Sequence, residues 1–254
     1  MNTVKVRNVI IGEGIPKICV PIFEKTAEEI LSEAKDIAGL MPDIAEFRAD
    51  RFEGYRDAGS LRAVLAGLRD ALGEIPVLFT IRTSEEGGEA EIGEAEYAGL
   101  IEKACESGSI DMVDVEALRL GDAESIIEVA HSHGVKVVAS HHDFEKTPTK
   151  DEIIKDFTEM LKTQADILKI AVMPQGLGDV KILMEAAEEM SDEHADRPII
   201  AISMSDKGTV SRIAAEAFGS AVTFGAASKA SAPGQIGVED LREALEDFHE
   251  SLDE

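Results

Sequence analysis

Tryptophan is absent from this sequence of 254 residues, and tyrosine and cysteine occur twice each. The two cysteines, Cys19 and Cys105, lie far apart among apolar residues. Neither a disulfide framework nor a cysteine-based metal site is therefore expected. No apolar run reaches the roughly 18 residues that a membrane helix needs, and the first segment lacks the basic start and long apolar stretch of a secretory signal. We expect a cytoplasmic protein that does not bind membranes.

Basic residues are scarce as well. Lysine and arginine number 25 against 51 aspartates and glutamates, which gives a formal net charge of −26. Nucleic acids and anionic membrane surfaces bind basic surfaces, so neither is an expected partner. The same excess repels anionic small molecules at long range, so a site for one would need its own group of arginines and lysines. The hydrophobic share of 44% is that of a globular protein with a large core.

Short apolar segments alternate with helix-like segments, and each pair takes about 30 residues, as in an eight-fold barrel. Strands are expected at residues 17–23, 44–50, 76–83, 112–117, 136–144, 165–174, 198–205 and 221–228. Helices are expected at residues 26–39, 59–72, 91–106, 123–133, 150–161, 179–190, 209–218 and 238–251. Near-continuous apolar strands alternating with helices predict the α/β class and a parallel (β/α)8 TIM barrel. We expect one domain over residues 1–254, with a short N-terminal β-hairpin at residues 4–11 closing the bottom.

Two other architectures fit parts of this pattern. Two domains are the other option at this length. A doubly wound open sheet is the second alternative, but it would have a glycine-rich phosphate-binding turn after an early strand. The segment Gly12-Glu13-Gly14 lacks the third glycine at the required spacing and opens no helix. The barrel therefore remains the favoured prediction.

Lys169 stands in the middle of an apolar, β-branched segment, ADILKIAVMP, at residues 165–174. Alternation along a strand places Ile167, Lys169 and Ala171 on one face. Because such a strand is buried on both faces, we expect Lys169 to point into an enclosed space. Enclosure disfavours a charged amine, and a neutral amine can attack a ketone to form a Schiff base. The alternative is a lysine at a strand end that extends its charged group to water.

Charged and polar residues interrupt the apolar strands near the ends where barrel active sites are built. They are Glu46, Arg48, Asp50, Arg82, Glu86, Asp114, Glu116, Ser140, His141, His142, Asp143, Lys169, Ser203, Ser205, Arg212 and Lys229. Barrel strands have no solvent-facing side that would accommodate so many charges. A buried lysine together with three arginines predicts a ligand that is an anion and carries a ketone. The small-residue loop at 231–235 is suited to act as a lid.

Two of the histidines are candidates for acid–base chemistry, whereas the other four fit helix ends or the surface. His141 and His142 are consecutive on one expected strand, so only one of them faces the barrel interior near Lys169. Alternation alone does not say which. A histidine there could abstract a proton next to a Schiff base and later protonate a leaving hydroxyl. A nearby carboxylate such as Glu86 could fix its tautomer.

These residues resemble those of the type I 3-dehydroquinate dehydratases, enzymes of the shikimate pathway of aromatic amino acid biosynthesis. The resemblance covers essentially the whole chain. Its most specific segments are EFRAD at 46–50, FTIRTSEEGGE at 79–89, SHHDFEKTP at 140–148, KIAVMPQ at 169–175, ISMSDKGTVSR at 202–212 and FGAASKASAPGQI at 224–236. The resemblance implies a (β/α)8 barrel, a homodimer, and a reaction that needs neither a metal nor another cofactor.

The resemblance also implies a role for each matched residue. Lys169 would form the Schiff base with the C3 ketone of 3-dehydroquinate. His142 would remove a C2 proton and help to expel the C1 hydroxyl, a syn elimination that gives 3-dehydroshikimate, and Glu86 would orient this histidine. The implied substrate-binding residues are Glu46, Arg48 and Arg82 for the hydroxyls, and Arg212, Ser231 and Gln235 for the carboxylate.

Two residues depart from the family's pattern. Pro21 stands where some relatives have a serine, and His141 stands where an asparagine is common.

Two rival functions can be compared with this one. A Schiff-base aldolase that acts on a sugar phosphate would need a cradle of backbone amides around the last two strands. A binding barrel that has lost its activity would be expected to lack Lys169, His142 or Glu86, and all three are present.

Overall fold

The computed structural model describes residues 3–227 and 236–252, and strands and helices alternate along most of this length. The strands are β1 (Val4–Val6), β2 (Val9–Ile11), β3 (Lys17–Ile22), β4 (Ile44–Arg48), β5 (Val77–Thr80), β6 (Met112–Val115), β7 (Lys136–Asp143), β8 (Ile167–Val172), β9 (Ile199–Ser203), β10 (Val222–Ala226) and β11 (Ile236–Gly237). The helices are α1 (Ala27–Leu40), α2 (Ala58–Leu72), α3 (Glu94–Glu106), α4 (Ala123–Ser132), α5 (Lys150–Leu161), α6 (Leu177–Glu189), α7 (Thr209–Ile213) and α8 (Val238–Leu252).

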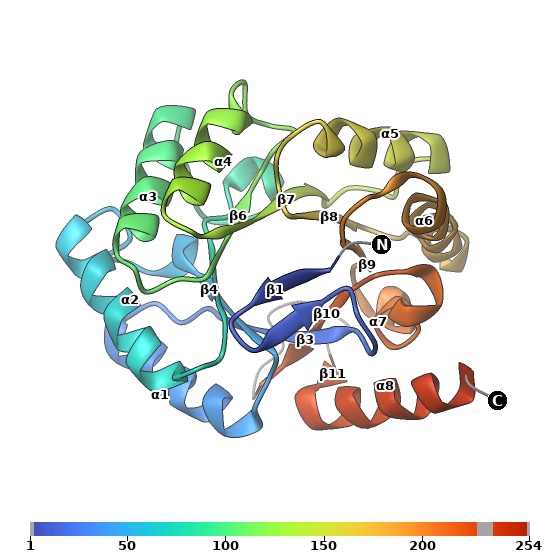
Figure 1. Cartoon of the computed structure of the whole chain (residues 1–254), viewed down its shortest axis with the longest axis horizontal. Helices are drawn as coiled ribbons and strands as arrows, with labels where there is room; N and C mark the ends of the chain where they lie inside the picture. The colour runs from blue at the N-terminus through green and yellow to red at the C-terminus, as the bar shows by residue number, and fades with distance from the viewer. Residues whose placement is uncertain (1–2, 228–235, 253–254) are drawn as a thin grey trace.

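The strands from β3 to β10 form a parallel sheet that follows the order of the chain and curls until β10 pairs with β3. Between β9 and β10 the contact is a parallel bridge of Ile199 with Ser220, and the amide of Ala221 donates to Ile199 O at 2.8 Å. The helices lie outside the strands (Figure 1). The predicted (β/α)8 barrel is therefore confirmed, with β11 as a short parallel extension beside β10.

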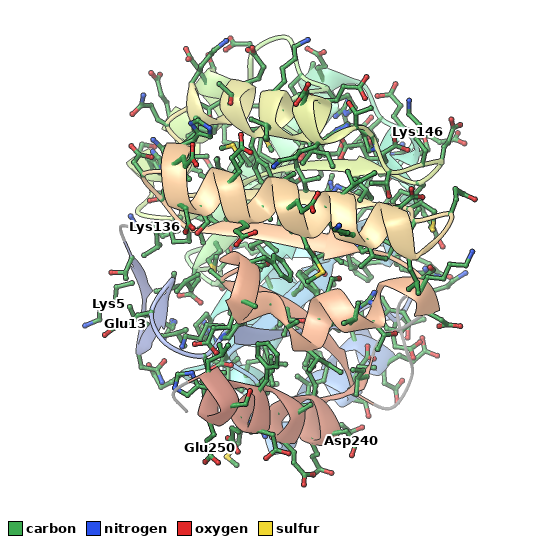
Figure 2. The ribbon with its side chains drawn as sticks, turned by 90° about the vertical axis from the view of Figure 1, so that its right-hand side faces the viewer. Lys5, Glu13, Lys136, Lys146, Asp240 and Glu250 are labelled. Carbon is green, nitrogen blue, oxygen red and sulfur yellow. The ribbon has the colours of Figure 1, made fainter. Side chains whose placement is uncertain are left out.

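The N-terminal hairpin of β1 and β2 covers the end of the barrel where the strands begin. In Figure 2, Lys5 of the hairpin lies on the same side of the molecule as Lys136, the first residue of β7, and Lys146 lies on the opposite side. The apolar residues that meet there are Val4, Val6, Val9, Ile11, Cys19, Ile44, Leu78, Met112, Val138, Ile167, Ile200, Ala221, Val222 and Phe224. The hairpin closes the bottom as predicted, so the interior of the barrel opens toward the carboxyl ends of the strands.

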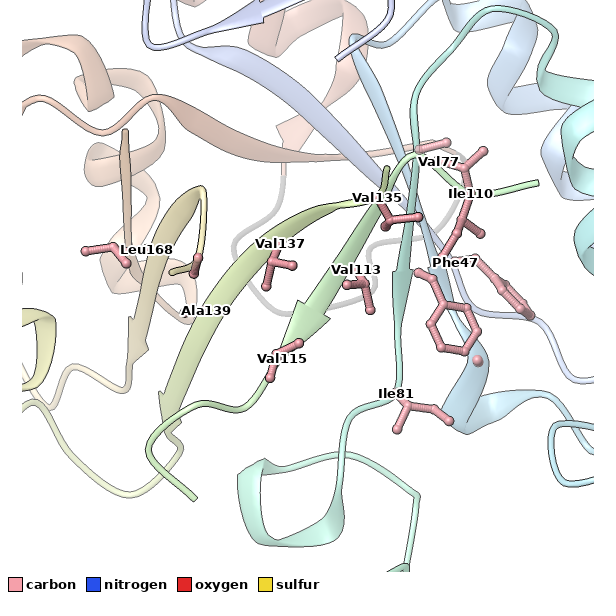
Figure 3. Close-up of a cluster of buried hydrophobic side chains, with 14 of the residues drawn as sticks. Phe47, Val77, Ile81, Ile110, Val113, Val115, Val135, Val137, Ala139 and Leu168 are labelled. Carbon is pink, nitrogen blue, oxygen red and sulfur yellow. The ribbon is translucent and has the colours of Figure 1, made fainter. Parts of the chain in front are cut away.

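Side chains alternate between the two faces of each strand. Outward-facing residues such as Phe47, Val113 and Leu168 belong to the large apolar cluster that also includes the inner faces of the helices (Figure 3). Inward-facing residues are apolar near the strand starts and polar further along, as in β8, where Ile167 is followed two residues later by Lys169. Burial of both strand faces explains the near-continuous apolar segments of the sequence.

Two expected segments differ from what the sequence suggested. The helix expected over residues 209–218 is interrupted, because Ala214 has φ −88° and ψ 19° and a 3₁₀ turn over Ala215–Phe218 follows α7. The tighter turn places Phe218 in a buried position. The strand expected over residues 76–83 ends at Thr80, since Arg82 and Thr83 already belong to the loop that presents Glu86.

Candidate active site

The barrel has a cavity of about 170 Å³ at the carboxyl ends of its strands. A cavity of about 150 Å³ can hold a benzene-sized ring, so a small cyclic molecule fits this space. Glu86 lies directly behind the lining residue His142, whereas Ser231 and Gln235 are outside the described residues. The cavity is lined by Glu46, Arg48, Arg51, Arg82, Gly87, His142, Phe144, Lys169, Ala171, Ile202, Met204, Arg212 and Phe224.

Lys169 is enclosed as expected, with 4% of its surface exposed. Its Nζ lies 3.4 Å from Asp114 Oδ2 and 3.9 Å from Glu46 Oε1. The same atom lies 4.7 Å from the centre of the Phe224 ring. The expectation from enclosure alone was incomplete, because two carboxylates and an aromatic face stabilise an ammonium group here. These contacts hold the amine at a fixed point of the cavity wall.

Asp114 joins the lysine to the arginine network behind it. Its Oδ1 accepts hydrogen bonds from Arg82 Nη2 at 2.8 Å and from Ser140 Oγ at 2.6 Å, while its Oδ2 faces Lys169. Burial alone would raise the pKa of Asp114, but the charges of Arg82 and Lys169 outweigh burial and hold it below its usual value. Asp114 is therefore an ionised anchor between the two cations.

Arg82 is surrounded by carboxylates. Besides the Asp114 contact, its Nη1 donates to Glu116 Oε1 at 3.0 Å and to Glu86 Oε2 at 3.3 Å. Burial alone would lower the pKa of Arg82, but the charges of Asp114, Glu116 and Glu86 raise it above its ordinary value. Both terminal nitrogens thus contact protein carboxylates, and the predicted contact of Arg82 with a substrate hydroxyl stays a prediction.

Replacement of Arg82 by methionine removes the shared cation of three buried carboxylates. We expect the free energy of unfolding to fall by about 3–5 kcal/mol, because a buried charge that loses its partner is strongly destabilising. Urea unfolding at neutral pH measures this change. Arg56→Met is the matched control, since Arg56 also pairs with a carboxylate, Glu96 at 2.8 Å, but on the exposed surface. Equal losses in the two variants would contradict a structural role for the buried network.

His142, and not His141, faces the cavity. The register of β7 with β8 pairs Ser140 with Lys169 and His142 with Ala171, so these four residues share the inner face. His142 Nδ1 lies 2.9 Å from Glu86 Oε2. A carboxylate only accepts hydrogen bonds, so Nδ1 carries the hydrogen and Nε2 keeps its lone pair.

The His142 ring is a neutral base at neutral pH. Burial, followed by the positive charges of Arg82 and Lys169, lowers the pKa of His142 well below its usual value. Burial also raises the pKa of Glu86, against the hydrogen bond from His141 and the charge of Arg82. The side chain of His142 is 8% exposed, so its basic nitrogen is available only to a molecule inside the cavity.

The loop that presents Glu86 depends on two glycines. Ser84–Glu86 form a 3₁₀ turn that Gly87 ends with φ 80°, a left-handed conformation that glycine adopts without strain. A Cβ at Gly88 would collide with the backbone oxygen of Arg82. These close approaches fix the loop, and with it the carboxylate of Glu86, between Arg82 and the two histidines.

The pKa values of Arg48 and Arg212, two further arginines of the cavity, are shifted in opposite directions. Nε and Nη2 of Arg48 each lie 2.9 Å from an oxygen of Asp50, and these contacts outweigh burial and raise the pKa of Arg48. Burial lowers the pKa of Arg212 to about 10, and the charge of Asp206 opposes this shift only in part. A bound anion would stabilise such a buried guanidinium. The buried guanidinium of Arg212 on this wall of the cavity is therefore suited to a carboxylate.

Several residues of the cavity wall were not predicted from the sequence. The Phe144 ring stacks on the His142 ring, with 6.4 Å between centroids and 23° between planes. Arg51 pairs with Glu89 at 2.9 Å, and its charge directly after EFRAD was a usable signal. Phe144 and Phe224 carry no such signal, because in the sequence they resemble any apolar strand residue.

Neither a metal site nor a membrane helix is found in the described ranges. Among residues 3–227 and 236–252, no group of three or more histidines, cysteines, aspartates and glutamates is arranged to hold a metal ion. Within the same ranges, no helix is long and apolar enough to span a bilayer.

Comparisons with known proteins agree on one family. Residues 18–251 match the model of a family described as Type I 3-dehydroquinase. The 3-dehydroquinate dehydratase of Listeria monocytogenes serotype 4b (strain F2365) is 48% identical over 253 residues, which are 99% of this chain and 100% of that protein. A crystal structure of the type I 3-dehydroquinate dehydratase of Clostridium difficile with covalently modified comenic acid has a TM-score of 0.95 and 45% identity, and the match covers 98% of this chain and 99% of that one. The 3-dehydroquinate dehydratase of Geobacillus kaustophilus HTA426 also has a TM-score of 0.95, with 39% identity over 98% of this chain and 97% of its own.

Proposed function

This chain belongs to the type I 3-dehydroquinase family, and we propose that it is a hydro-lyase that removes water from 3-dehydroquinate to give 3-dehydroshikimate in the shikimate pathway. The observation that carries the proposal is one cavity lined by an enclosed amine, a neutral histidine and a buried guanidinium, from Lys169, His142 and Arg212. Elimination by way of an imine uses those three groups: a nucleophile for the ketone, a base for the adjacent proton and a cation for the carboxylate.

Imine formation is the proposed first step. The Lys169 ammonium group first gives one proton to solvent, and the neutral amine then attacks the C3 carbonyl carbon. The carbinolamine that forms takes up one proton and loses its oxygen as water, which leaves an iminium ion. Asp114 and Glu46 stand beside this nitrogen at 3.4 and 3.9 Å, so they can stabilise the iminium charge. The hydroxyl of Thr80 donates to Glu46 at 2.8 Å and holds that carboxylate in place. The iminium withdraws electrons and acidifies the C2 proton.

Elimination follows on one face of the bound ring. His142 Nε2 takes the C2 proton, and the C–H electrons form an enamine. The enamine electrons then expel the C1 hydroxyl, which receives a proton from His142 and leaves as water. Because one histidine takes and returns the proton, the elimination is syn, and Glu86 stabilises the intermediate imidazolium. Hydrolysis of the product iminium consumes the water released in the first step, so the net reaction loses one water.

Substrate orientation is the third part of the proposal. The carboxylate of 3-dehydroquinate would lie at Arg212, whose buried charge gains from an anion, and Ser231 and Gln235 would add hydrogen bonds. Glu46, Arg48 and Arg82 would contact the ring hydroxyls. The expectations of a single domain over residues 1–254, a homodimer and a cytoplasmic location stay predictions.

Borohydride trapping tests the imine. Sodium borohydride reduces an iminium to a stable secondary amine, so the protein treated together with 3-dehydroquinate should gain one adduct in its intact mass. Peptide mapping should place that adduct on Lys169. Dihydroxyacetone phosphate is the matched probe for an aldolase and should give no adduct. A folded protein that stays unmodified by 3-dehydroquinate would contradict the imine mechanism.

A further inference from the structure

The carboxylate of Glu86 is shared between two histidines. Its Oε2 lies 2.9 Å from His142 Nδ1, and its Oε1 lies 3.1 Å from His141 Nδ1. Alternation directs the two rings to opposite faces of β7. The side chain of His142 is 8% exposed, and that of His141 is 29% exposed. Glu86 is therefore held at one oxygen from inside the barrel and at the other from its outer side.

The two histidines lie in opposite electrostatic surroundings. The hydrogen bond to Glu86, together with the charges of Glu86, Asp156 of α5 and Asp143 of β7, raises the pKa of His141 against the effect of burial. His142 is influenced first by burial and then by the positive charges of Arg82, Lys169, Arg48 and His141, all of which lower its pKa. Over the pH range in which His142 gains its proton, His141 already carries one.

We propose that His141 is a positioning residue that acts on His142 through Glu86. It fixes the outer oxygen of Glu86 and, when charged, draws part of the carboxylate's negative charge away from His142. His142 consequently remains a neutral base at lower pH than it would beside an uncharged residue. The proposal rests on the proposed function, in which His142 is the acid–base group.

His141→Asn tests the proposal, because asparagine keeps a side-chain N–H near the position of Nδ1 and removes the charge. Loss of the cation lets His142 bind a proton more readily. We expect the acid limb of kcat/KM to move to higher pH by about half a pH unit, equal to about threefold less activity on the limb. The alkaline plateau should change by less than about threefold.

A second measurement does not depend on turnover. The histidine ring Cε1–H signals can be followed by NMR against pH without substrate, and the His142 signal is identified by its absence in His142→Asn. In His141→Asn the His142 titration should move to higher pH, in the same direction as the acid limb. Asp156→Asn should lower the pH at which His141 titrates, because it removes one of the negative charges acting on this ring. Asp151→Asn is the matched control, since Asp151 is an exposed residue of the same helix, and it should move neither signal.

The outcomes separate the two proposals. An acid limb and a His142 titration that both stay in place in His141→Asn would overturn the role of His141. A uniform loss of kcat at all pH values without a shift of the limb would do the same, because it indicates a merely structural contact. A shifted His142 titration in a protein that does not dehydrate 3-dehydroquinate would support the coupling and sink the proposed function.

Discussion

Replacement of Lys169 by alanine should abolish both the covalent adduct and turnover. We expect kcat to fall by about 10⁴-fold or more, the scale seen when a covalent nucleophile is removed, and no mass to be added by borohydride in the presence of 3-dehydroquinate. The reason is that Lys169 supplies the nitrogen on which the electron sink is built. Without an iminium, the C2 proton is too weakly acidic for a histidine to remove. Turnover assays at a high enzyme concentration measure the fall in kcat, and intact-mass measurements show whether the borohydride adduct is absent.

The Lys169→Ala variant should remain folded, which makes its loss of activity interpretable. Asp114 keeps its hydrogen bonds with Arg82 at 2.8 Å and Ser140 at 2.6 Å, so no buried carboxylate is left without a donor. Lys207→Ala is the matched control: Lys207 is exposed and its Nζ donates to Gln175 O at 2.8 Å. This control should keep full activity. An adduct that persists in Lys169→Ala would mean that another amine is the nucleophile.

The barrel and the set of inward-facing charges follow from local patterns. A parallel barrel buries both faces of every strand, so its strands appear as continuous apolar segments, and a charge within one must point to the interior or to a strand end. All strands of such a barrel end on the same side. Glu46, Arg82 and Lys169, which are far apart in the sequence, could therefore be predicted to share one site, and they line one cavity.

The pairing of charges could not be predicted in the same way. Which carboxylate meets which cation depends on distances between strands and on loop backbones, such as the close approach of Gly88 to Arg82. The choice between His141 and His142 needed the register that sets Ser140 opposite Lys169, and no pattern within a single strand contains that information. The lid residues expected at 231–235 lie outside the described residues, so their prediction stays open.

Replacement of His142 by asparagine should separate imine formation from elimination. Asparagine can still donate to Glu86 from a position close to Nδ1, but it has no group in place of Nε2. We expect the borohydride adduct on Lys169 to form as before, while kcat falls by about 10²–10⁴-fold, the usual contribution of a general acid–base group. His133→Asn is the matched control, because His133 is exposed and hydrogen-bonds within its own helix end, to Ser132 and Val129 O. Normal turnover in His142→Asn would show that another group moves the proton.

His142→Asn should lower activity but raise stability relative to the wild type at low pH. The pKa of His142 is lowered in the folded protein from an ordinary value of 6.5. Below about pH 6.5, the unfolded chain therefore binds a proton at His142 more readily than the folded protein does. Above about pH 6.5, the full contribution of neutral His142 to the free energy of unfolding of the wild-type protein is present. This contribution is lost as the pH falls toward the folded-state pKa, at up to about 1.4 kcal/mol per pH unit. His142→Asn lacks this titration. The difference in free energy of unfolding between the variant and the wild type should therefore shift in favour of the variant as the pH falls. Urea unfolding at a series of pH values measures the difference, and a constant difference across that range would mean that His142 is not held neutral. A histidine that its surroundings keep neutral is expected to lower the stability of the protein in acid and, as the catalytic base, to raise kcat.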